Sequence, residues 1–181
     1  MWQKLFLTIC IGTSGILFSQ DSGVRGAIAM EFPAPSIAAF QESSQTKIYD
    51  FYNYLGLLTT PKLSNNLKTQ IRENIYTLFR DTNINIPDPT SENPDKMTLQ
   101  QLLDAMEKHS KTTFTVVGMQ SFPVTFEDYW VNTYTLEIKT GTQKTTKNLQ
   151  QKIYFHPEQK TFGSTTKEVW TLKLGEVSTL N

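Results

Sequence analysis

The spacing of apolar residues changes once along the chain. Between about residues 46 and 110, apolar side chains recur mostly at spacings of three and four, and beyond residue 110 they alternate with polar ones. The first spacing places side chains on one face of a helix, whereas alternation places them on one face of a strand. The sequence therefore predicts a helical first half and an extended second half.

Three amphipathic helices are expected in the first half. The apolar stripe of the first helix comprises Ile48, Phe51, Tyr52 and Leu55. The second helix has Ser64 as its N-cap, and its inner face comprises Leu67, Ile71, Ile75, Leu78 and Phe79. The third opens with Thr98 and Gln101 in the spacing of a capping box, and His109 falls in its last turn. Each helix therefore has one apolar face that needs a partner.

The second half predicts an antiparallel meander. Alternating segments rich in Thr, Tyr, Val and Trp occupy residues 112–117, 128–139, 147–156 and 163–174. The last two joins, "TGTQ" (140–143) and "HPEQK" (156–160), are short, and short joins indicate hairpins. The expected fold class is α+β, with three N-terminal helices packed on the concave face of a curved antiparallel sheet of four to six strands.

This order of elements resembles the nuclear transport factor 2-like fold and the related cystatin-like fold over about residues 45–176. Within it, "IRENIYTLF" (71–79) resembles the helix that enters the sheet, and "STTKEVWTLKL" (164–174) resembles the last long strand. The resemblance implies three helices inside a bent sheet. Its members include small enzymes (isomerases, dehydratases and cyclases) and non-catalytic binding or dimerisation modules, so it does not choose between these functions.

The N-terminus has the pattern of a secretory signal peptide. Lys4 precedes the uncharged stretch "LFLTICIGTSGILF", and small residues allow cleavage after Ser19 or Ala29. We therefore expect a signal peptide at 1–29, a flexible arm at 30–44, and export to the periplasm or the extracellular space. Either cleavage removes Cys10, so the mature chain would be cysteine-free and would keep no stable membrane span.

The charge balance is neutral, with 17 basic and 17 acidic residues. A weak overall field does not steer nucleic acid toward the protein, so no nucleic-acid partner is expected.

A polar residue interrupts the apolar row of the strand at 128–139, and this row suggests a candidate site. Asn132 lies between Trp130 and Tyr134 on the face that should meet the core. A loop at 140–143 places Asn132 opposite Gln151, and a turn centred on Glu158 and Gln159 would place Gln151 opposite Thr166. The expected pocket consists of Trp130, Asn132, Tyr134, Gln151, Thr166, Glu168 and Trp170. The alternative is that the amides hydrogen-bond one another within the core.

Other chemistry has weaker signals. His109 and His156 are isolated, so no metal site is expected, and no P-loop, G-x-S-x-G or G-x-G-x-x-G motif assigns a catalytic residue or a cofactor. Asp128 with Tyr134 or Tyr154 could form the acid and phenol of an isomerase pocket. "FTVVG" (114–118) resembles the Q-x-V-x-G loop of cystatin inhibitors, with Phe in place of Gln.

Together these features favour an exported, non-catalytic binding or assembly module of a bacterial envelope, with an unknown protein partner or small ligand. A β-branched outer row suits homodimerisation through the sheet, and it comprises Val131, Thr133, Thr135, Val169 and Thr171. The first alternative is a small-pocket enzyme of the isomerase or dehydratase type, and the second is a cystatin-like protease inhibitor.

Overall fold

The structure is a computed structural model that describes residues 32–92, 96–122 and 129–180. Within these ranges the chain forms three helices, a two-stranded sheet and a four-stranded antiparallel sheet, which confirms the α+β class. The helices are α2 (Ala34–Leu58), α3 (Asn65–Leu78) and α4 (Leu99–Met106). The strands are β1 (Asn85–Pro87), β2 (Lys96–Thr98), β3 (Thr112–Phe122), β4 (Tyr129–Thr140), β5 (Gln143–Phe162) and β6 (Thr165–Thr179). The predicted signal peptide lies outside the described residues.

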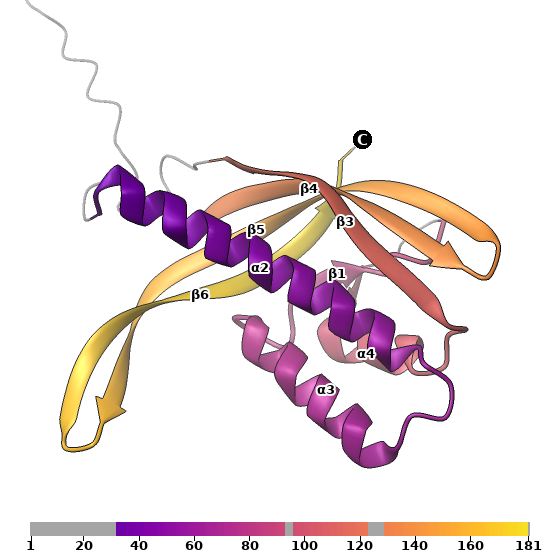
Figure 1. The fold of residues 1–181 in the computed structure, drawn as a ribbon, viewed down its shortest axis with the longest axis horizontal. Helices are drawn as coiled ribbons and strands as arrows, with labels where there is room; N and C mark the ends of the chain where they lie inside the picture. The colour runs from indigo at the N-terminus through magenta and orange to yellow at the C-terminus, as the bar shows by residue number, and fades with distance from the viewer. Residues whose placement is uncertain (1–31, 93–95, 123–128, 181) are drawn as a thin grey trace, which may run out of the picture.

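The long helix α2 crosses one face of the four-stranded sheet, and α3 and α4 lie together on one side of it (Figure 1). α2 contacts β3 and β6, whereas α4 contacts α2, β1 and β2, and α3 contacts α2 and β6. We call this covered face the inner face, and it carries Trp130, Asn132, Tyr134, Leu136 and Ile138 of β4. The opposite, outer face carries Val131, Thr133 and Thr135.

The first helix begins earlier than expected. We expected a flexible arm over 30–44, but α2 starts at Ala34, with Pro33 as its N-cap and a second proline in the first turn. Proline is compatible with this position because the first helical N–H groups have no intrahelical partner. Phe40 then packs against Phe155, with 4.5 Å between ring centroids. This tertiary contact explains why a Pro- and Ser-rich segment is helical.

Both predicted caps are present. The Ser64 side chain accepts a hydrogen bond from the Leu67 N–H at the start of α3, and Thr98 forms the capping box of α4 with Gln101. Leu67 itself is exposed and does not belong to the buried face of α3. α4 ends at Met106, so His109 follows the helix and does not lie in its last turn.

The sheet has the order β3-β4-β5-β6, which confirms the meander. The predicted register of β4 against β5 is also confirmed, with Asn132 opposite Gln151. Gly141 has a φ of 59° in the turn between these strands. Two-residue hairpin turns with glycine first need such a positive φ, which other residues rarely adopt.

The predicted turn at Glu158 and Gln159 is wrong. β5 continues to Phe162, and the chain reverses at Gly163, whose φ is 62°. Pro157 does not stop the strand because β4 begins only at Tyr129, opposite Tyr154, so β5 has β6 as its single described neighbour at Pro157. A proline costs no ladder bond where its missing N–H would point away from a partner.

Beyond the other strands, β5 and β6 form a two-stranded projection, which we call the arm and define as residues 158–169. It extends from the body at the lower left of Figure 1. Phe32, Phe40, Phe155 and Trp170 form an aromatic cluster at its base, with ring centroids 4.5 to 5.5 Å apart. This cluster joins the first turns of α2 to the arm.

Candidate functional site

The inner face of β4 places three of the predicted site residues side by side in the core. Trp130, Asn132 and Tyr134 alternate along the strand, and their exposed fractions are 3%, 0% and 2%. Gln151 lies opposite Asn132 on β5 and is also 0% exposed. The strand periodicity therefore brings four of the seven predicted residues together, but it brings them together beneath α2.

Ser44 of α2 is the polar partner of this row. Its hydroxyl accepts hydrogen bonds from Asn132 Nδ2 at 2.9 Å and from Trp130 Nε1 at 3.3 Å, and it donates to the Gln41 carbonyl at 2.6 Å. Because the Ser44 proton is used by Gln41, the amide of Asn132 must present its NH₂ group to Ser44. Asn132 Oδ1 has no hydrogen-bond partner among the described residues.

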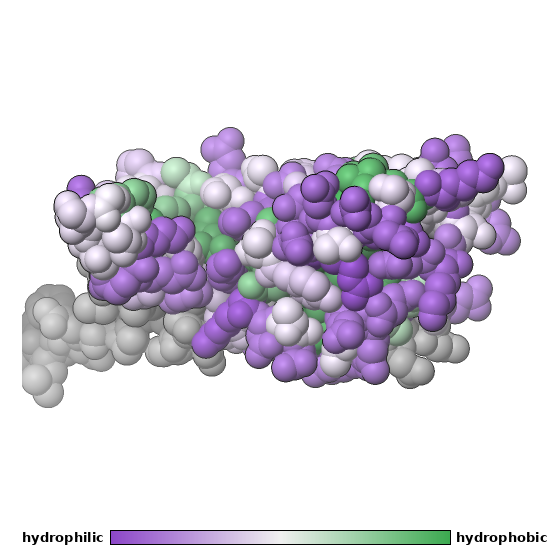
Figure 2. Space-filling view, turned by 90° about the horizontal axis from the view of Figure 1, so that it is seen from below, coloured by the Kyte–Doolittle hydropathy of each residue, from purple (hydrophilic) through white to green (hydrophobic). Residues whose placement is uncertain are grey.

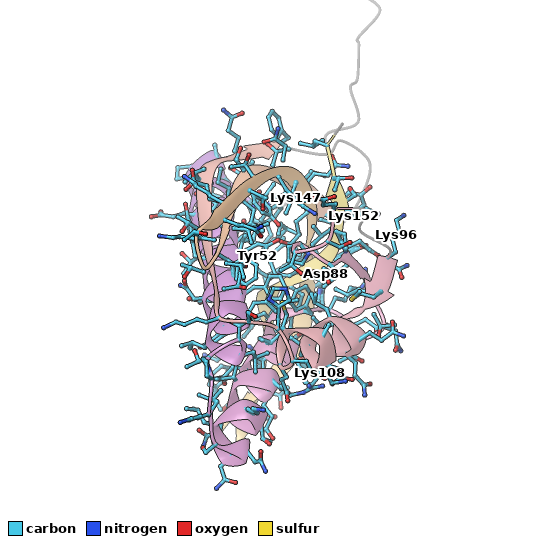
Figure 3. All side chains as sticks on the ribbon, turned by 90° about the vertical axis from the view of Figure 1, so that its right-hand side faces the viewer. Tyr52, Asp88, Lys96, Lys108, Lys147 and Lys152 are labelled. Atoms are coloured by element: carbon cyan, nitrogen blue, oxygen red, sulfur yellow. The ribbon has the colours of Figure 1, made fainter. Side chains whose placement is uncertain are left out.

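A second hydrogen-bonded chain runs from α2 to β6. The hydroxyl groups of Tyr52 and Tyr134 are 3.0 Å apart, and Tyr134 donates to Gln151 Oε1 at 3.3 Å. Gln151 Nε2 donates to the Gly175 carbonyl at 3.4 Å. Figure 3 shows Tyr52 extending from α2 toward the sheet. The chain therefore connects α2, β4, β5 and β6 across the inner face.

Burial controls the acid–base behaviour of the two phenols. It raises the pKa of Tyr52 above its ordinary value of 10.0, although the hydrogen bond between Tyr52 and Tyr134 acts in the opposite direction. Burial also raises the pKa of Tyr134, and the hydrogen bond with Tyr52 and the negative charge of an ionised Tyr52 would raise it further. A phenolate would be an uncompensated charge in the core, so both groups stay neutral at physiological pH.

Two of these partners were not identified from the sequence. Ser44 was assigned to the flexible N-terminal segment predicted at 30–44, and Tyr52 was counted as part of the apolar stripe of the first helix. A signal for Ser44 does exist, because it lies four residues before Ile48 and therefore on the same helical face. A polar residue on that stripe indicates a buried partner across the interface.

The other three predicted residues lie elsewhere, because the register of β6 follows from the turn at Gly163. Gln151 faces Val177, whereas Thr166 faces Thr161 in the arm. Glu168 is exposed in the same arm. Trp170 belongs to the aromatic cluster at the base of the arm, so the expected seven-residue pocket is split.

The weaker candidates are also separated. Asp128 lies outside the described residues. The Tyr154 hydroxyl donates to Glu176 Oε2 at 3.0 Å on the outer face, and the ring lies 4.3 Å below the guanidinium carbon of Arg80. Phe114 and Gly118 bound a segment inside β3, so "FTVVG" does not form a hairpin tip.

The described part of the chain lacks two further features. No cluster of three or more His, Cys, Asp or Glu residues there is suited to hold a metal ion. None of its helices combines the length and the apolar character needed to cross a membrane.

A hollow of ≈ 270 Å³ lies between α2 and the base of the arm. Its lining comprises Phe40, Ser43, Lys47, Glu158, Lys160, Trp170, Thr171, Leu172 and Lys173. Burial, reinforced by the charges of Lys173 and Lys160, lowers the pKa of Lys47, although Asp50 acts in the opposite direction. We call this hollow the arm groove.

No protein-family model matches the chain, and no curated protein sequence is similar to it.

Proposed function

We propose that the chain is an exported, non-catalytic binding or assembly module of a bacterial envelope, which engages a protein partner through the arm. The leader pattern supports export. The order of helices and strands supports a nuclear transport factor 2-like domain, in which the three helices close the concave side of the sheet.

The arm is the observation that carries this proposal. Its residues extend beyond β3 and β4, and Phe162 at its tip is 57% exposed. A two-stranded hairpin is marginally stable on its own because it buries little surface. A partner that covers the arm would therefore stabilise it by burying its exposed surface.

The inner face supports a structural role for the polar row. Ser44, Asn132 and Gln151 are each 0% exposed. Asn132 bonds to Ser44 across the interface, whereas Gln151 bonds to Tyr134 and Gly175 within the sheet. A ligand would have to displace α2 to reach them. We therefore assign this network to the specificity of helix docking and the arm to binding.

The test compares the full chain with an arm-shortened variant in the cells that produce it. Glu158 pairs with Val169, so replacing residues 159–168 by Asn-Gly creates a two-residue hairpin turn. The control replaces residues 139–144 by Asn-Gly between the paired Ile138 and Thr145. Native mass spectrometry of each purified protein then reports the mature N-terminus, the subunit count and any retained small molecule.

We expect cleavage after Ser19 or Ala29 and an assembly that contains more than one chain. The control should retain this assembly and the arm-shortened variant should lose it, with unchanged thermal unfolding of the body. An uncleaved, monomeric chain that carries a small molecule would contradict the proposal and favour the isomerase or dehydratase alternative.

A further inference from the structure

The outer edge of β6 is open along the arm groove. β6 is the last strand of the sheet, and beyond the single bridge between Phe79 and Leu174 no described strand pairs with that edge. The Arg80 N–H donates to the Leu174 carbonyl at 2.9 Å, so the backbone of Leu174 points away from β5. Because this orientation repeats every second residue, Leu172 and Trp170 also present their N–H and C=O groups outward.

The arm groove follows this open edge. It is lined by four consecutive residues of β6, from Trp170 to Lys173. Successive side chains of a strand point to opposite faces, so a hollow that touches all four must lie along the edge of the strand. Figure 2, viewed from below, shows hydrophobic residues between the arm and the body, with hydrophilic residues around them. Phe40 supplies an apolar wall from α2.

The charges around the groove favour an anionic occupant. Lys47, Lys160 and Lys173 line it from three different elements, against one carboxylate, that of Glu158. The Glu158 carboxylate is already engaged by His156, with 3.2 Å between Oε1 and Nε2. Lys173 also donates to the Thr77 carbonyl at 2.8 Å, which leaves Lys47 and Lys160 as the less engaged cations.

We propose that the open edge of β6 binds an extended acidic peptide segment of a partner protein as an added strand. The backbone of that segment hydrogen-bonds to Trp170 and Leu172, and its carboxylates face Lys47 and Lys160. Strand addition derives affinity from main-chain hydrogen bonds and specificity from the side chains beside the edge. This inference rests on the proposed binding function and specifies the chemistry of the partner.

The charge requirement is tested on the full chain with synthetic probes. The first probe is a fluorescein-labelled peptide of alternating Glu and Val, and the matched probe has Lys in place of Glu. Fluorescence anisotropy should show binding of the acidic peptide alone. Lys47→Gln and Lys160→Gln should each weaken it about two- to fivefold, as expected for single exposed or half-exposed ion pairs. Lys139→Gln, at the opposite end of the sheet, should not change it.

The strand requirement is tested with two N-methylated versions of the acidic peptide, one methylated at the Glu residues and one at the Val residues. Each keeps the charge but loses the N–H donors along one edge. One version should bind about as well as the parent, and the other should bind at least about tenfold more weakly. Hydrogen exchange at the Trp170 and Leu172 amides should slow when the parent peptide is bound.

Equal binding of both methylated peptides and the parent would overturn strand addition, and equal binding of the acidic and basic peptides would overturn the charge requirement. Failure of every peptide to bind, while the native assembly still depends on the arm, would overturn this inference alone. Loss of that arm dependence as well would overturn the proposed function.

Discussion

Ser44 on α2 accepts a 2.9 Å hydrogen bond from Asn132 on β4, and both side chains are fully buried. This bond explains why a strand that faces the core carries an amide. A buried amide needs a partner, and only one placement of α2 provides it. The pair therefore fixes the position of the helix along the sheet, a specificity that apolar contacts alone would not give.

Removing the Ser44 hydroxyl should destabilise the protein. Ser44→Ala deprives both Asn132 Nδ2 and Trp130 Nε1 of their acceptor, and buried unpaired donors are costly. We expect the free energy of unfolding to fall by roughly 2–4 kcal/mol in urea titrations followed by tryptophan fluorescence. Ser43→Ala is the control: Ser43 is exposed, so its change should stay within about 0.5 kcal/mol. Equal effects at the two serines would contradict the assigned network.

The two buried tyrosines should respond unequally to removal of their hydroxyl groups. Tyr134→Phe leaves both the Tyr52 hydroxyl and Gln151 Oε1 without their bond to this group, whereas Tyr52→Phe leaves Tyr134 bonded to Gln151. We expect unfolding free energies lower by roughly 2–3 kcal/mol for Tyr134→Phe and about 1 kcal/mol for Tyr52→Phe. The double variant should lower the free energy of unfolding by less than the sum of the two single effects. A larger effect at Tyr52 would contradict this order.

Stability should fall in alkaline solution because the folded state keeps both phenols protonated. Burial raises the pKa values of Tyr52 and Tyr134 above 10.0, so above about pH 10 the unfolded chain binds fewer protons than the folded one. The stabilisation is complete below that pH and is lost as pH rises, by up to about 1.4 kcal/mol per pH unit for each group. Urea titrations between pH 9 and 11 measure the slope. The Tyr52→Phe/Tyr134→Phe variant should show a shallower slope, and an unchanged slope would refute the assignment.

Gly175 should not tolerate a side chain. A Cβ placed there would lie 2.4 Å from Cε2 of Tyr154, so Gly175→Ala should lower the free energy of unfolding by about 1–3 kcal/mol. Gly56→Ala is the matched control: its Cβ would meet neighbours at 3.4 Å and beyond inside α2, where alanine is favoured by about 0.5–1 kcal/mol. The midpoint temperature of thermal unfolding should therefore fall for Gly175→Ala and rise for Gly56→Ala.

A double variant locates the cause of the Gly175 effect. If the Tyr154 ring is the obstacle, Gly175→Ala should cost little in a Tyr154→Ala background, because the clash has already been removed. Strictly additive costs would show that the ring is not responsible.

Local rules explain most of what the sequence predicted correctly. The caps at Ser64 and Thr98 depend on residues three positions apart, and the register of β4 against β5 depends on the short loop at Gly141. The second turn was misplaced because "HPEQK" (156–160) was taken as the join between two strands, whereas the Gly163-Ser164 pair offered an equally clear turn signal. This one misplaced turn put Thr166 and Glu168 in the predicted pocket, whereas both lie in the arm.

By itself, the sequence determined the α+β class, the meander and the pairing of Asn132 with Gln151, because helix and strand periods and short turns act over neighbouring residues. Only the tertiary structure decided that Asn132 bonds to Ser44 and that Tyr134 bonds to Tyr52. Both bonds depend on where α2 lies on the sheet, and each joins residues more than eighty positions apart. No spacing along the chain encodes such contacts directly.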